Sequence, residues 1–386
     1  MVRIQNVITI NDFNFIQGGA SKVAIDSANM IAEKGLNSIF VSAVGKIEES
    51  DLKDNVIQYS LQNTEFLNYK NKIKGMYKGI RNKDFSSLVE LILEQFSPLD
   101  TVVHVHGWTK ACSSDFFKIL KEKKFHVFLT LHDYFSICPN GALLNYKKNK
   151  SCNKKCMSFG CAISNCDSRN YIFKIYRFLR EAEYKHDIDF QYIHPIFISE
   201  FQYKNMEKYL GNMKKYSILN NPVKFLDSLE VPIYDFVYIG RNSKEKGLDL
   251  FVEAAKKNKE YSFLIVGDYK KSERIDNLYI TGWVKEDEVN DYLKKSKVFV
   301  LTSLLPEPFG LNLVKAVNAG IPCLAASNTS AIEFIENGKN GYIFQQGDFN
   351  SMNELISKVI KLPREKKNNK ETSSYIENLI KIYTSS

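Results

Sequence analysis

The sequence predicts an α/β protein with two domains, each built on a parallel sheet. The chain has 386 residues, which is more than one ordinary hydrophobic core contains. Short apolar runs alternate with helical patterns in both halves, and this alternation is typical of parallel sheets. Between the halves, residues 218–235 contain Asn-Pro and Val-Pro steps that interrupt helices and strands alike. We therefore place a domain boundary at Pro222.

The first half contains five apolar runs of strand length. We expect strands over residues 4–10, 37–45, 101–107, 126–132 and 193–199. A helical pattern over residues 19–35 separates the first two runs, and Gly35 ends it. The resulting strand–helix–strand order favours parallel pairing within the first sheet.

The second half repeats this order. We expect strands over residues 234–240, 261–267, 277–282 and 297–303, each closed by a glycine or a small polar residue. Helical patterns cover residues 248–258, 286–296 and 309–320. From Pro363, a polar loop precedes one amphipathic helix. The predicted division is an N-terminal domain of residues 1–221 with a cysteine-rich insert at 138–168, a second domain of residues 222–365, and a C-terminal helix within 366–386.

The composition is that of a folded protein with a basic surface. Hydrophobic residues make up 44% of the chain, charged residues make up 25%, and the net charge is +9. This charge favours phosphorylated metabolites, anionic lipid or nucleic acid as partners, but no nucleic-acid-binding module accompanies it. The sequence contains no apolar run of about 18 residues and no signal-peptide pattern. We expect a cytoplasmic protein and leave peripheral membrane contact open.

Arg241 and Lys246 follow the strand expected over residues 234–240 and precede a helix. Parallel sheets bind ligands at the carboxyl ends of their strands. Two cations beside a helix N-terminus suit a pyrophosphate group. In a chain with 53 lysines and arginines, solvated surface cations are an equally good interpretation of these two residues alone.

The stretch "PEPFGLNLVK", residues 306–315, places Glu307 at another strand–loop–helix turn. Pro308 stiffens the approach, and Gly310 allows the backbone to come close to a ligand. Amides at the start of the next helix can receive anionic oxygens, and a carboxylate can accept hydrogen bonds from sugar hydroxyls. A glutamate that merely complements the helix dipole is the alternative, which the Pro-Phe-Gly context disfavours.

Gly18 and Gly19 lie between the first strand and the first helix, where backbone can pack against a ligand. A double glycine alone is a weak signal. It lacks the Gly-x-Gly-x-x-Gly spacing of dinucleotide-binding proteins, which argues against a nicotinamide-dependent dehydrogenase.

His132 ends the strand expected over residues 126–132 and faces the same cleft as the other strand ends. It can donate to a sugar hydroxyl or assist a proton transfer. His104 and His106 share one side of the preceding strand. We interpret His104 as a hydrogen-bonded core residue and His106 as a second functional candidate.

Five of the seven cysteines lie in one lysine-rich segment: Cys138, Cys152, Cys156, Cys161 and Cys166. The paired Cys-x-x-Cys knuckles of zinc sites are missing, and a cytoplasmic disulfide is disfavoured. Free thiols packed in a lid and a structural metal site are the two interpretations that remain.

In this order, these motifs resemble the bacterial family 4 glycosyltransferases of the GT-B fold, in which two Rossmann-like domains face a central cleft. The resemblance covers nearly the whole chain. Residues 240–255, "GRNSKEKGLDLFVEAA", are similar to the family's donor-diphosphate loop, and residues 280–344 are similar to its most specific block. Residues 129–141, "LTLHDYFSICPNG", with the cysteine-rich insert resemble a subgroup that builds surface polysaccharides and lipopolysaccharide.

The resemblance implies a retaining hexosyltransferase that moves a sugar from a nucleotide diphosphate sugar to a glycan or lipid-linked acceptor. It implies no cofactor and no metal ion, because cations and helix amides would neutralise the leaving diphosphate. It implies that the first domain binds the acceptor, that the second binds the nucleotide sugar, and that the C-terminal helix packs back on the N-terminal domain. It places His132 and Glu307 at the catalytic positions and His106 on the acceptor side. The implied donor-binding residues are Gly18, Gly19, Arg241, Lys246, Phe309, Gly310, Leu311 and Lys315.

Lys315 departs from the family pattern, which has a second glutamate there to bind the ribose. Lysine is a donor without an acceptor, so it can bond a ribose or phosphate oxygen but not in the same way. We prefer an active enzyme, because Glu307, Arg241 and Lys246 are retained. A weakened or non-catalytic nucleotide-sugar-binding homologue, and a nucleotide-sugar epimerase on the same fold, are the alternatives.

Two segments combine lysines with aromatic residues: 70–83, "KNKIKGMYKGIRNK", and 145–155, "NYKKNKSCNKK". Such segments can lie against an anionic membrane surface, here the inner face of the membrane. A solvated lysine-rich surface is an equally good interpretation of the sequence.

Overall fold

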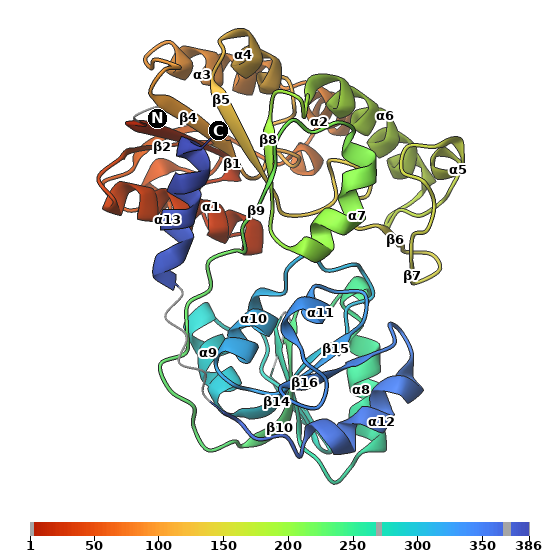
Figure 1. The fold of residues 1–386 in the computed structure, drawn as a ribbon. Helices are drawn as coiled ribbons and strands as arrows, with labels where there is room; N and C mark the ends of the chain where they lie inside the picture. Colours follow the sequence, from red (N-terminus) through yellow and green to blue (C-terminus); the bar gives the residue numbers. More distant parts are fainter. Residues whose placement is uncertain (1–3, 268–271, 366–371, 386) are drawn as a thin grey trace.

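The computed structural model describes residues 4–267, 272–365 and 372–385, which form two α/β domains (Figure 1). Each domain has a seven-stranded sheet with helices packed against it. The predicted fold class is therefore confirmed. The predicted loop at residues 366–371 lies outside the described residues.

The N-terminal sheet is parallel throughout, in the order β3-β2-β1-β4-β5-β8-β9. Its strands are β1 (Asn6–Phe13), β2 (Asn37–Val44), β3 (Ile57–Asn63), β4 (Thr101–Val105), β5 (His126–Leu131), β8 (His194–Phe197) and β9 (Ser217–Ile218). Every residue of β1 is buried, because this strand lies inside the sheet with neighbours on both sides. β6 (Leu144–Asn145) and β7 (Lys150–Ser151) form a separate antiparallel pair in the cysteine-rich insert.

The helices of this domain include the predicted one, which ends two residues earlier than expected, before Gly35. They are α1 (Gly19–Glu33), α2 (Lys72–Ile80), α3 (Lys83–Leu93), α4 (Phe116–Glu122), α5 (Phe159–Ala162), α6 (Tyr171–Asp187) and α7 (Glu200–Leu210), with the short 3₁₀ turns η1 (Ile47–Glu49) and η2 (Phe66–Asn68). Gly35 has a φ of +80°, which a residue with a side chain rarely adopts, so it ends the helix.

The second sheet has the order β12-β13-β11-β10-β14-β15-β16, and only the β12–β13 pair among these strands is antiparallel. Its strands are β10 (Tyr234–Gly240), β11 (Phe263–Gly267), β12 (Glu273–Ile275), β13 (Leu278–Ile280), β14 (Ser296–Leu301), β15 (Cys323–Ala326) and β16 (Gly341–Phe344). Its helices are η3 (Lys244–Lys246), α8 (Leu248–Lys257), α9 (Glu286–Lys294), α10 (Leu311–Asn318), α11 (Ala331–Phe334) and α12 (Phe349–Val359). β9 ends at Ile218 and β10 begins at Tyr234, so Pro222 lies in the connection between the two sheets.

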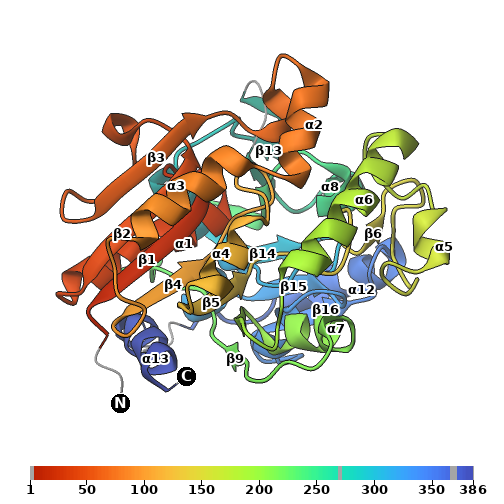
Figure 2. The same cartoon turned by 90° about the horizontal axis from the view of Figure 1, so that it is seen from above.

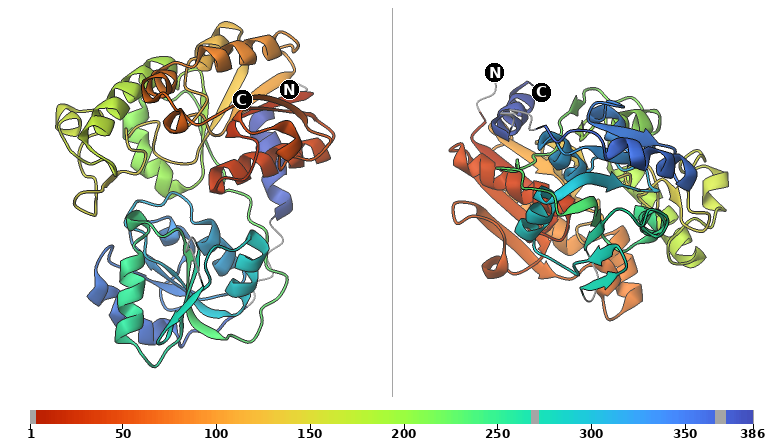
Figure 3. Two further views of the ribbon diagram at one scale, coloured as in Figure 1. Left: turned by 180° about the vertical axis from the view of Figure 1, so that it is seen from behind. Right: turned by 90° about the horizontal axis from the view of Figure 1, so that it is seen from below.

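The last helix, α13 (Thr372–Thr384), returns to the N-terminal domain (Figure 2, Figure 3). Its buried residues Tyr375, Leu379 and Tyr383 pack against one face of the first sheet, which contributes Val7 and Phe128. The carboxyl end of the chain therefore belongs to the core of the first domain. Among the described residues, no helix combines the length and the apolar character that crossing a membrane requires.

Candidate active site

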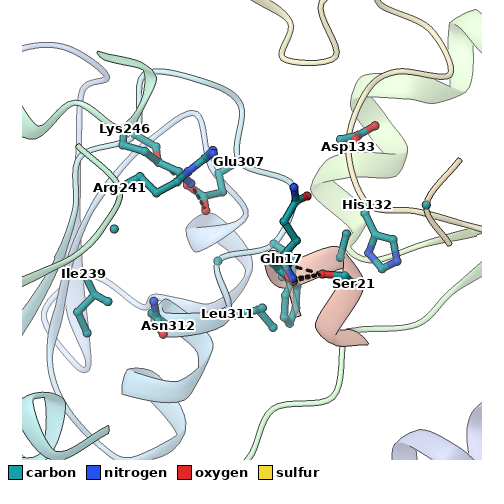
Figure 4. A pocket seen from close by; sticks show the side chains of 18 of the residues that line it. Gln17, Ser21, His132, Asp133, Ile239, Arg241, Lys246, Glu307, Leu311 and Asn312 are labelled. Atoms are coloured by element: carbon teal, nitrogen blue, oxygen red, sulfur yellow. Dashed lines mark hydrogen bonds and ion pairs between the residues drawn. The ribbon is translucent and has the colours of Figure 1, made fainter. Parts of the chain in front are cut away.

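A cleft of about 760 Å³ lies between the two domains and is lined by residues that follow β1, β4, β5, β10 and β14. This volume is in the range of small-molecule binding sites. Ten of the eleven predicted site residues line it: Gly18, Gly19, His106, His132, Arg241, Lys246, Glu307, Phe309, Gly310 and Leu311. Arg241, Lys246 and Glu307 lie on the wall formed by the second domain, and His132 lies on the opposite wall (Figure 4).

Lys246 and Glu307 form an ion pair, with the lysine Nζ 2.9 Å from the glutamate Oε1 (Figure 4). Ser303 donates a hydrogen bond to the other carboxylate oxygen of Glu307. Gly247 has a φ of +65°, and a side chain there would collide with the carbonyl of Thr302. The glycine thus lets the loop after β10 pack against the end of β14, which brings the two charged side chains together.

The N-terminus of α10 opens toward the cleft beside this ion pair. Gly310 caps the helix, and Leu311 and Asn312 are the first helical residues, all three in the cleft lining. The unpaired amides at a helix start, together with the helix dipole, favour anionic groups. The side chain of Arg241 is 73% exposed, and its Nη2 lies 3.9 Å from the Oε1 of Glu245. This wall can therefore receive a pyrophosphate.

A chain of three histidines leads from the core to the cleft. The Nε2 of His132 lies 2.9 Å from the Nδ1 of His106, and the ring of His106 lies 4.1 Å from that of His104, measured between centroids. His104 bonds Tyr383 of α13 at 2.5 Å and Thr130 at 2.7 Å, as expected for a core histidine. Burial lowers the pKa of His104 to about 3 and that of His132 to about 4. His132 is therefore neutral at physiological pH and can serve as a hydrogen-bonding group.

Asp133 is a cleft residue that the sequence reasoning missed. Its Oδ1 accepts a hydrogen bond from the amide of Phe135 at 2.9 Å. The side chain opens into the cleft, but the surrounding protein desolvates it and raises its pKa to about 6. Its position directly after His132, at the end of β5, was the available signal.

A polar group near the entrance of the cleft was also missed. The Nζ of Lys110 donates to the Oε1 of Gln17 at 2.7 Å, and both residues line the cleft. The buried carboxylate of Asp12 accepts hydrogen bonds from the amides of Lys110, Ala111 and Cys112 at 2.7 to 3.1 Å. Asp12 therefore holds the loop after β4 in place. Because its partners are main-chain amides, the sequence offers no signal for this role.

Lys315 is the one predicted site residue outside the cleft lining, although it lies in the described part of the chain. It is buried on α10, and its Nζ donates to the Oδ1 of Asn290 on α9 at 2.7 Å. Its predicted contact with the donor nucleotide stays a prediction. In this structure the side chain joins two helices of the second domain.

The seven cysteines all carry free thiols. Across the described residues, no group of three or more histidine, cysteine or acidic side chains is arranged so that it could hold a metal ion. Within the insert, the Sγ of Cys161 accepts a hydrogen bond from the Nζ of the fully buried Lys174 at 3.3 Å. Of the two interpretations from the sequence, this arrangement favours packed free thiols.

Contacts across the cleft fix the relative position of the two domains. Ser199 donates to the carbonyl of Pro308 at 2.5 Å, and the Glu333 carboxylate accepts from the amides of Glu200 and Phe201 at the start of α7. The first contact reaches the turn that contains Glu307. The N-terminal domain thus contacts the loop that carries this carboxylate.

The fold resembles that of solved glycosyltransferase structures. Residues 232–378 match the family model of the glycosyl transferases group 1. The structure of Anabaena Alr3699/HepE in complex with UDP-glucose superposes with a TM-score of 0.65 at 12% identity, covering 99% of this chain and 100% of that one. At this identity the similarity shows the fold alone.

Some of the relatives with similar sequences come from regions or pathways of surface polysaccharides. An uncharacterized 42.6 kDa protein in the cps region of Klebsiella pneumoniae is 25% identical over 82% of this chain and 83% of its own length. The capsular polysaccharide biosynthesis glycosyltransferase CapM of Staphylococcus aureus is 29% identical over 32% of this chain and 36% of its own length. The chain spans less than half the length of the first curated relatives that it matches.

The two-domain architecture is that of the GT-B fold. Within that fold, residues 232–378 are similar to the glycosyl transferases group 1, and two relatives come from a cps region and from capsular polysaccharide biosynthesis.

Proposed function

We propose that this protein is a retaining glycosyltransferase of family 4 that transfers a hexose from a nucleotide diphosphate sugar to a hydroxyl group of a lipid-linked glycan. The observation that supports this most directly is the Lys246–Glu307 ion pair facing His132 across the cleft. One wall offers cations and helix amides for a diphosphate, and Glu307 offers acceptor oxygens for sugar hydroxyls.

In the proposed reaction, the bond between the sugar and the diphosphate breaks, and negative charge develops on the leaving phosphate oxygen. Lys246, Arg241 and the first amides of α10 would stabilise that charge. Because Lys246 then interacts with phosphate, Glu307 becomes available to the hydroxyls of the donor sugar. We expect no metal ion to be required, since these groups can neutralise the diphosphate themselves.

On the other wall, neutral His132 would hold a hydroxyl of the transferred sugar near the reacting carbon, and His106 would orient its ring. Asp133 would accept a hydrogen bond from the acceptor hydroxyl. The acceptor oxygen would bond to the anomeric carbon on the face from which the diphosphate departs, and its proton would pass to the departing phosphate oxygen. Because the new bond forms on the face of the broken one, the glycosidic bond retains the anomeric configuration of the donor. We also propose that the protein acts in the cytoplasm, at the inner face of the membrane.

The test is a thermal-shift screen of UDP-, GDP- and dTDP-sugars in the presence of a chelator, followed by product analysis with and without glycan acceptors. We expect one nucleotide sugar to raise the Tm of the native protein and to be consumed only when an acceptor is present. A new sugar nucleotide formed without acceptor would identify an epimerase instead. Binding without turnover on any acceptor would identify a non-catalytic homologue.

A further inference from the structure

The outward face of α6 is apolar. Ile172, Ile175 and Leu179 follow one another at intervals of three and four residues, so they share this face, and Ile172 is 73% exposed. The short helix α5 packs against α6 and adds Phe159, which is 81% exposed, and Ile163 just beyond its end. We call these five side chains the apolar ridge. Large apolar residues gathered at such exposure mark an interaction surface.

The segment that contains the apolar ridge has exposed cations but no exposed carboxylates. Residues 145–182 contain only two acidic residues, Asp167 and Glu181, and both are buried. The exposed cations of this segment are Lys147, Lys148, Lys150, Lys154, Lys155 and Arg169. The surface is therefore complementary to a negatively charged partner along the whole segment.

Helix α2 extends this surface on the other side of α6. The hydroxyl of Tyr176 on α6 donates to the carbonyl of Met76 on α2 at 3.1 Å. Residues 70–83 contain six cations and no acidic residue, and Ile73 and Tyr77 are exposed among them. Lys78 and Arg81 pair with the carboxylates of Asp84 and Glu183, which leaves four cations of this segment to attract an anionic partner. Figure 2 shows α2, α6 and α5 in succession along the side of the molecule opposite to α13.

We propose that the apolar ridge and the flanking lysines of α2 and the insert form a docking surface for a membrane rich in anionic lipid. Aliphatic and aromatic side chains that project between lysines suit the boundary between headgroups and acyl chains, while the lysines attract anionic headgroups. The inference rests on the proposed function for its biological purpose, because a lipid-linked acceptor is presented at such a boundary.

The inward face of α6 connects this surface to the cleft. The Nη1 of Arg180 donates to the carbonyl of Thr109 at 3.2 Å, and the ring of Tyr184 lies 4.6 Å from that of Trp108. Thr109 and Trp108 both line the cleft. One helix therefore has its outward face on the membrane and its inward face on the acceptor side of the active site.

The test is flotation of the full-length protein with vesicles of phosphatidylcholine alone or mixed with phosphatidylglycerol, in the absence of any sugar nucleotide. We expect binding to the anionic vesicles and at least about tenfold weaker partitioning for the double variant Ile172→Asp and Leu179→Asp. Charge reversal of Lys72 and Lys74 to glutamate should weaken binding separately and reduce its dependence on salt. Leu99→Asp is the matched control, because Leu99 is 81% exposed outside the ridge.

Equal flotation of the ridge variant and the native protein would overturn the proposal, as would absence of binding to anionic vesicles. Concentration-dependent dimerisation that the ridge variant abolishes would show that a second copy covers the ridge instead. The nucleotide-induced thermal shift of the ridge variant should equal that of the native protein. Failure of the docking surface is thus distinguishable from failure of the proposed transferase activity.

Discussion

The Nζ of Lys246 lies 2.9 Å from the Oε1 of Glu307, and the two side chains are 22% and 14% exposed. They come from loops after β10 and β14, which are neighbours in the second sheet. Before a donor binds, each charge is compensated by the other. We therefore expect a diphosphate that attracts Lys246 to release Glu307 for sugar hydroxyls, so that the pair would couple recognition of the two halves of the donor.

We expect Lys246→Met to lower kcat/KM by about 10²- to 10³-fold, because one positive group that stabilises the leaving diphosphate is lost. Glu307→Gln keeps the shape of the side chain but loses its charge, and it should lower kcat/KM by about 10- to 100-fold. Steady-state kinetics with the donor found in the screen would measure both. If the double variant loses as much as the two single losses multiplied together, the two residues act independently and the proposed coupling is wrong.

Gly18 provides a test that leaves the fold intact. No heavy atom lies within 4 Å of a side-chain carbon placed at this residue, whereas one placed at Gly19 lies 3.1 Å from the Leu311 Cδ1. Gly18→Leu should therefore project into the cleft, change stability by no more than about 0.5 kcal/mol, and raise the donor KM at least about tenfold. Gly18→Ala is the matched control, and we expect it to raise the donor KM much less. An unchanged KM for the leucine variant would place the donor elsewhere.

The long strands and the site residues that directly follow them could be predicted from the sequence. The wholly buried β1 and the loop residues Lys246 and Glu307 were recognisable because an apolar run followed by a glycine or a small polar residue marks the carboxyl end of a buried strand. Short strands were harder, since β15 is the four-residue run Cys323–Ala326 and lacks a clear period.

Other features depend on tertiary contacts that no local pattern encodes. The bond between Tyr383 and His104 joins residues 279 positions apart, and it requires α13 to cross back onto the first sheet. The partner of Lys315, Asn290, lies on a different helix. Asp133 was overlooked because its chemistry depends on desolvation within the cleft, which only the assembled domains produce.

The buried histidines predict how stability depends on pH. His132 has a pKa of about 4 in the folded protein, below its ordinary value of 6.5. Between these values the unfolded chain binds a proton that the folded protein excludes, so the free energy of unfolding falls as the pH drops from 6.5 to 4. The slope contributed by one histidine is at most about 1.4 kcal/mol per pH unit. Asp133, with a pKa raised to about 6, opposes this trend between pH 6 and 3.8.

Urea unfolding of His132→Gln between pH 7 and 5 would measure this contribution. We expect a shallower loss of stability on acidification than in the native protein, because glutamine does not titrate. His186→Gln is the control, since the side chain of His186 is 74% exposed. Parallel stability curves for the native protein and His132→Gln would show that the pKa of His132 does not change on folding, which would contradict the lowered pKa.

Variants of Lys315 can show whether this residue stabilises the fold or binds the nucleotide sugar. Its Nζ donates to the Oδ1 of Asn290 at 2.7 Å, and the residue is 5% exposed on α10. Lys315→Met keeps most of the buried stem but leaves the Asn290 oxygen without this donor, which should cost about 1–3 kcal/mol of stability. Because Lys315 lies outside the cleft lining, we expect the donor KM to change far less than in Lys246→Met.

Chemical unfolding and donor titration of Lys315→Met, beside Lys315→Glu, would decide between the two roles. A KM that rises as much as in Lys246→Met would show that Lys315 leaves Asn290 and reaches the nucleotide, as the family's glutamate position predicts. If instead the native chain binds no nucleotide sugar and Lys315→Glu gains binding, the lysine has disabled the donor site. In that case the transferase activity proposed for the native chain is wrong, and a nucleotide-sugar-binding homologue without turnover takes its place.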